Sequence, residues 1–123
     1  MNQYLYVMAG AAAGGLARYI VSTQIMERFP IRFPIGTFVV NVTGCFLIGL
    51  LMTWFTERGE PHPGARLLLV TGVLGGYTTF SSYAWESFSA VEGRNFWIGM
   101  ANLVGSMVAG YIAVWCGSLL ARR

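Results

Sequence analysis

The chain has 123 residues, of which 55% are hydrophobic and 11% are charged. A soluble domain usually carries about a quarter charged residues, so this composition excludes an ordinary soluble protein and indicates an integral protein of the lipid bilayer. The net charge of +3 comes from scattered arginines and not from a basic cluster, which excludes a nucleic-acid-binding surface.

Four apolar runs, separated by short polar loops, predict an all-α membrane protein with four transmembrane helices. Each run is long enough to cross a bilayer as a helix. The expected spans form a single domain, residues 1–123, and cover about 4–26, 35–56, 67–91 and 96–120.

The first run contains a GxxxG motif at Gly10 and Gly14, followed by Arg18. Small residues at this spacing let helices approach closely in lipid, so the two glycines predict a helix-packing face. Two interpretations of Arg18 remain open. Its side chain either snorkels toward the membrane interface or lies as a cation beside a polar cavity.

In the second run Thr37, Asn41 and Gly44 share one helix face. An asparagine in the middle of a span is costly to expose to lipid. Its side chain either forms a hydrogen bond to another helix or donates its NH₂ group to a passing anion.

The third run contains the most unusual stretch, Gly72–Tyr83. Two adjacent glycines, Gly75 and Gly76, are followed by four hydroxyl residues among aromatic ones. Irregular backbone at membrane depth lies against protein or a wet cavity, so the stretch predicts a broken helix beside an ion path. A simple helix-packing notch at the glycines is the alternative.

Beyond the glycines, Phe80 and Tyr83 share a helix face because they are three residues apart. Thr79, Ser82 and Glu86 form a second stripe beside that face. Glu86 is either a buried charge or an interface residue, and the sequence leaves both open.

The fourth run carries small or weakly polar residues at helical spacing, including Gly99, Asn102 and Ser106. This face is expected to pack inward. Cys45 and Cys116 both fall inside apolar runs, where a free cysteine packs as a small hydrophobe.

Four spans place both termini on one side of the membrane. Arginines outside the spans are nearly balanced between the sides: Arg58, Arg66, Arg122 and Arg123 lie with the termini, and Arg28, Arg32 and Arg94 lie opposite. The positive-inside rule therefore gives almost no preferred orientation. Four short helices also make thin walls for a pore, which favours a closed two-fold assembly. Together these points predict an antiparallel homodimer.

Three blocks of the sequence resemble the Fluc (CrcB-type) fluoride channel family: Gly15-Leu-Ala-Arg18-Tyr19, Gly36-Thr-Phe-Val-Val-Asn41-Val-Thr-Gly44 and Thr71-Gly-Val-Leu-Gly75-Gly-Tyr-Thr78-Thr-Phe80-Ser81. The similarity extends over all four spans, and the second and third blocks are specific in residue type, order and spacing. It implies an antiparallel dual-topology homodimer in the cell (inner or plasma) membrane. Such a dimer exports cytoplasmic fluoride passively through two pores and holds a structural sodium ion at its centre.

The resemblance also implies roles for individual residues. Asn41 resembles the family's pore asparagine, and Phe80 the first phenylalanine of its paired-aromatic box. Tyr83 stands where most relatives have the second phenylalanine, and Ser82 where a threonine is common.

By the same resemblance, Thr37 and Arg18 correspond to vestibule residues, and Ser81 and Ser106 to the polar track. Gly110 falls where some relatives carry a hydroxyl. The break from Gly75 to Thr78 matches the one whose backbone carbonyls bind sodium, a pair from each subunit.

Two other functions are alternatives to a fluoride channel. A small multidrug-type proton-coupled antiporter depends on a carboxylate in its first span, where this chain has Arg18 and no acid. A non-transporting assembly subunit of a larger membrane complex would use Asn41 and the aromatic pair for packing only. The sequence contains no recognisable nucleophile, base or metal cluster, so we do not expect an enzyme.

Overall fold

The computed structural model describes residues 2–123, and its regular secondary structure is all helical. Three long helices, α1 (Gln3–Arg28), α2 (Ile35–Arg58) and α5 (Phe96–Ala121), are long and apolar enough to cross a membrane. The third predicted span is divided into η1 (Leu67–Leu74), α3 (Gly75–Tyr77) and α4 (Phe80–Glu92). The predicted all-α architecture and the break in the third span are therefore confirmed.

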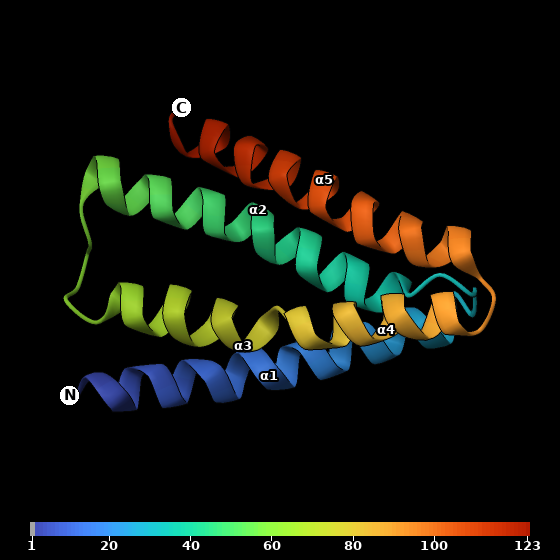
Figure 1. Ribbon diagram of the computed structural model, residues 1–123. Coiled ribbons are helices and arrows are strands. Elements are labelled where there is room, and N and C mark those ends of the chain that lie inside the picture. The colour runs from blue at the N-terminus through green and yellow to red at the C-terminus, as the bar shows by residue number, and fades with distance from the viewer. Residues whose placement is uncertain (1) are drawn as a thin grey trace.

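The helices run roughly parallel or antiparallel in one bundle (Figure 1). Both ends of the chain lie at the same end of the bundle, together with the loop 59–66, as expected for an even number of spans. The most extensive contacts join α2 to α5 and α1 to η1, while α4 packs against α5. Each half of the third span therefore has its own main partner.

Glycines make the contact between α1 and the first half of the third span. A Cβ added at Gly10 would lie 2.8 Å from the Cα of Gly72, and one added at Gly76 would lie 2.5 Å from the carbonyl oxygen of Ala11. A Cβ at Gly14 would collide with the carbonyl of Val73. The GxxxG motif is therefore a helix-packing face, as predicted.

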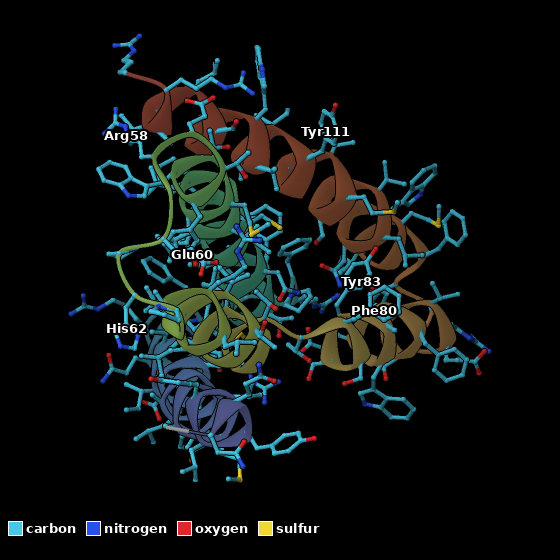
Figure 2. The ribbon with its side chains drawn as sticks, turned by 90° about the vertical axis from the view of Figure 1, so that its left-hand side faces the viewer. Arg58, Glu60, His62, Phe80, Tyr83 and Tyr111 are labelled. Atoms are coloured by element: carbon cyan, nitrogen blue, oxygen red, sulfur yellow. The ribbon has the colours of Figure 1, made fainter. Side chains whose placement is uncertain are left out.

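The break in the third span lies at Thr78 and Thr79, so it overlaps the predicted range of 75–78 only at Thr78 and extends one residue beyond it. Both residues are extended, with φ −85° and ψ 156° at Thr78 and φ −145° and ψ 120° at Thr79. Gly75 is helical, with φ −62° and ψ −37°. Figure 2, which looks nearly along the helices, shows α3 and α4 displaced sideways from one another and joined by this link.

Two hydroxyl groups stabilise the ends of the broken helix. The side chain of Thr78 donates a hydrogen bond of 2.9 Å to the carbonyl of Leu74, one turn earlier. The side chain of Thr79 accepts one of 3.2 Å from the backbone N–H of Ser82 and so caps the start of α4. The threonines after the glycines, more than the glycines themselves, fix where the helix ends and restarts.

The interior of the bundle contains many small and polar residues beside a few larger ones such as Phe55 and Leu74, whereas many large apolar side chains point outward. Ser87 and Asn102 are fully buried, while Trp97 is 81% exposed. This arrangement suits a protein whose surroundings are lipid.

Candidate functional site

Two cavities lie beside the break, and Thr79 lines both of them. The first, of about 410 Å³, is called the aromatic cavity here; the predicted site residues in its wall are Asn41, Gly75, Thr78, Phe80, Tyr83 and Ser106. The second, of about 290 Å³, is called the charged cavity; the predicted site residues in its wall are Arg18, Thr37 and Ser82, and Glu86 joins them. Ser81 is exposed and lines neither cavity.

Asn41 holds the break in place from α2. Its Nδ2 donates to the carbonyl of Thr79 and its Oδ1 accepts from the N–H of Thr79, both at 2.8 Å. The interhelical hydrogen bond left open by the sequence is therefore present. An asparagine amide has two N–H donors, so one remains available on a residue that lines the aromatic cavity.

The same hydrogen bonds release two backbone carbonyls. In a continuous helix the carbonyl of Gly75 would accept from the N–H of Thr79, which instead donates to Asn41. The carbonyl of Thr78 would accept from the N–H of Ser82, which instead donates to the hydroxyl of Thr79. Gly75 and Thr78 thus offer oxygen atoms without their usual helical donors, and oxygen is what a hard cation binds.

The aromatic pair has one exposed and one buried ring. Phe80 is 79% exposed and Tyr83 only 7%, with their ring centroids 5.7 Å apart and their planes at 52°. Figure 2 shows the two rings side by side on α4. The hydroxyl of Tyr83 donates a hydrogen bond of 2.6 Å to the backbone carbonyl of Leu103 on α5.

A buried chain of hydrogen bonds joins α4 to α5 behind the aromatic pair. Asn102 donates through Nδ2 to the hydroxyl of Ser87 at 2.8 Å and accepts from Ser106 at 3.0 Å. Ser87 in turn donates to the carbonyl of Tyr83 at 2.8 Å. Sequence reasoning missed Ser87. The signal was a second mid-span asparagine, Asn102, which needs a polar partner as Asn41 does.

The charged cavity holds an acid and a base that do not pair with each other. The Oε1 of Glu86 accepts from the hydroxyl of Thr37 at 2.8 Å, and its Oε2 is buried without a hydrogen-bond partner among residues 2–123. No ion pair joins Glu86 to Arg18 in this part of the chain. Arg18 therefore lies beside a polar cavity, and Glu86 is partly buried there.

The two cysteines are free thiols; Cys45 is half-buried, whereas Cys116 is exposed and does not pack inside the bundle. Cys45 lines the aromatic cavity, and a Cβ added at the buried Gly110 would lie 3.2 Å from its sulfur. A hydroxyl-bearing side chain at position 110 would therefore point toward Cys45.

Comparison with known proteins gives consistent matches along nearly the whole chain. A family model described as "CrcB-like protein, Camphor Resistance (CrcB)" matches residues 5–118. A protein of Solibacter usitatus named "Fluoride-specific ion channel FluC" is 60% identical over 121 residues, which cover 98% of this chain and 99% of the relative. Proteins of the same name from Acidobacterium capsulatum and Chloroflexus aurantiacus are 42% and 43% identical, and each match covers 97% of the relative.

Proposed function

The chain belongs to the CrcB-like family, and from this membership we propose that it is a fluoride-selective channel that exports cytoplasmic fluoride passively and so confers fluoride resistance. It is a multi-pass membrane protein, and we place it in the cell (inner or plasma) membrane. Its relatives are named as ion channels and not as enzymes, in keeping with a role in ion transport.

The aromatic cavity is the observation that carries the proposal. Fluoride is small and strongly hydrated, so a pore must replace its water with donors at close range. The free N–H of Asn41 supplies one donor, and the ring edges of Phe80 and Tyr83 carry partial positive charge. The first N–H groups of α4, which starts at the break, add a positive helix end.

We propose that a second, antiparallel copy of the chain completes the pore. Phe80 is largely exposed in one copy although it lines the cavity, so a single chain leaves the anion path open on one side. A two-fold homodimer closes such a path twice, giving two equivalent pores. The near balance of arginines between the two sides supports insertion in both orientations.

A structural sodium ion fits the carbonyls at the break. Gly75 and Thr78 would hold it with backbone oxygens, one pair from each subunit on the two-fold axis, as unwound segments bind cations in transporters. The ion would join the two subunits and supply positive potential near the anion path.

The remaining predicted residues extend the path on either side of the aromatic pair. Arg18, Thr37 and Ser82 in the charged cavity would form a vestibule. Ser81 and Ser106 would continue the polar track. Arg18 would attract fluoride to the vestibule, and Glu86, tied to Thr37, would limit the number of anions held there.

A passive channel is sufficient for this task. Neutral HF crosses membranes from acidic surroundings and ionises in the more alkaline cytoplasm, where fluoride is trapped. An inside-negative potential of about 100 mV favours the exit of one anion by about 2.3 kcal/mol. Fluoride therefore leaves without an energy-coupling site.

Fluoride-electrode efflux from liposomes containing the purified protein tests this function, with chloride as the control ion. We expect fluoride to leave and chloride to stay. Proton-coupled efflux of a cationic drug from the same vesicles would point to the antiporter instead. An intact dimer that releases neither ion would point to an assembly subunit.

A further inference from the structure

Tyr83 differs from Phe80 in how firmly its ring is held. The Tyr83 ring is 7% exposed, and its hydroxyl donates to the carbonyl of Leu103 at 2.6 Å. Phe80 is 79% exposed and has no polar atom with which to make such a bond. The aromatic pair thus consists of one ring anchored by a hydrogen bond and one largely exposed ring without such a bond.

The single proton of the Tyr83 hydroxyl is already used. A phenol carries one O–H donor, and here that donor points to Leu103 on α5. The hydroxyl therefore cannot donate to an anion in the aromatic cavity while the bond exists. What Tyr83 can present to an anion is the edge of its ring, as a phenylalanine would.

The structure behind the ring makes this anchor rigid. The backbone carbonyl of Tyr83 accepts from the hydroxyl of Ser87, which is bonded to Asn102 on α5. Tyr83 is thus tied to α5 at both ends of the residue, through its backbone and through its hydroxyl. A rotation about χ1 would break the bond to Leu103, so the ring cannot swing away from the cavity without that loss.

We infer that Tyr83 is a positioning residue, whose hydrogen bond to Leu103 fixes the ring edge and thereby sets the discrimination between fluoride and larger halides. This inference rests on the proposed function of a fluoride channel. Because chloride is larger than fluoride, we expect its passage beside Tyr83 to require a larger displacement of the ring. Loss of the anchor therefore favours chloride more than fluoride.

The test is halide efflux from liposomes containing Tyr83→Phe, which removes the hydroxyl and keeps the ring. We expect fluoride efflux to persist, chloride efflux to rise, and the fluoride-to-chloride ratio to fall about fivefold, the factor that one net hydrogen bond supplies. Tyr111→Phe is the matched control. Tyr111 lies on α5, is 79% exposed and points away from the aromatic pair (Figure 2), so the ratio should not change.

A donor restored at the ring tip separates an anchor from simple packing. With 4-aminophenylalanine incorporated at position 83, an N–H can reach the Leu103 carbonyl and the ratio should recover; 4-methylphenylalanine has the size without the donor and should not restore it. Should Tyr83→Phe fail to fold, the 4-methylphenylalanine protein replaces it in the comparison.

Two results would overturn the inference. A large fall in fluoride efflux with an unchanged ratio would make the hydroxyl a fluoride ligand, and unchanged efflux of both ions would leave the bond without a role in permeation. Absence of fluoride efflux from the native protein is a separate result, which would count against the proposed function itself.

Discussion

The first half of the third span, Leu67–Tyr77, packs on α1 backbone to backbone, whereas the second half, Phe80–Glu92, is held by side-chain hydrogen bonds. The first contact depends on the absence of side chains, since a Cβ at Gly10 or Gly76 would meet backbone atoms of the other helix. The second depends on buried polar groups, chiefly Asn102. Close glycine packing thus fixes the bundle, and the polar half positions the groups that line the cavities.

The largest effect should follow from filling the glycine contact. Gly14→Val places side-chain atoms against the Val73 carbonyl, and a rigid backbone cannot move aside cheaply. We expect a loss of about 1–3 kcal/mol of stability and little folded protein on size-exclusion chromatography in detergent. Gly105→Ala on α5 is the control, because a Cβ there meets nothing within 4 Å. Equal yields would mean that α1 and the third span are not packed as described.

A change in the polar half should remove function and keep the fold. Phe80→Ile removes an aromatic ring edge at a largely exposed position, so the packing of one chain depends little on it. We expect fluoride efflux from liposomes to be abolished or greatly reduced while the elution volume of the dimer stays the same. Unchanged efflux would remove Phe80 from the anion path.

An intermediate effect is expected where the polar half joins α5. Asn102→Ala removes the interhelical hydrogen bond to Ser87, which keeps its bond to the Tyr83 carbonyl, and removes the acceptor of Ser106 within α5. Hydrogen bonds of this kind between membrane helices contribute about 1 kcal/mol, so we expect a modest fall in melting temperature. If the melting temperature equals that of the native protein, α4 is held mainly by apolar contacts.

The smallest effect concerns the charged cavity, which lies between α1, α2 and the start of the second half of the third span. Arg18→Gln keeps a polar side chain on α1 and removes the positive charge that faces the cavity. We expect fluoride efflux to fall a few-fold at low ionic strength and to approach the native rate in high salt, because ions screen charges over about 10 Å at 0.1 M. A defect independent of salt would indicate a steric and not an electrostatic role.

Much of this architecture follows from local sequence. Apolar runs predicted the helices, and the GxxxG motif predicted the packing face on α1. The position of the break did not follow, because Asn41, far away in the sequence, takes the N–H of Thr79 and shifts the unwound residues past the glycines. Tyr83 and Asn102 each bond to a residue of another helix. Helical periodicity predicts which residues share a face, but it does not predict which helix packs against that face.

The hydrogen bonds from Asn41 to the break also bear on how the chain is inserted during synthesis. The third span is the only one with no single helix among residues 2–123 long and apolar enough to cross a membrane. Its unwound link exposes backbone groups that lipid cannot satisfy. Because α2 precedes it in the chain, insertion in chain order would place Asn41 in the bilayer before Thr79, where it can pair with both groups at once. In that order, the Asn41 side chain, which pairs with the N–H and the carbonyl of Thr79, enters the membrane before the break forms.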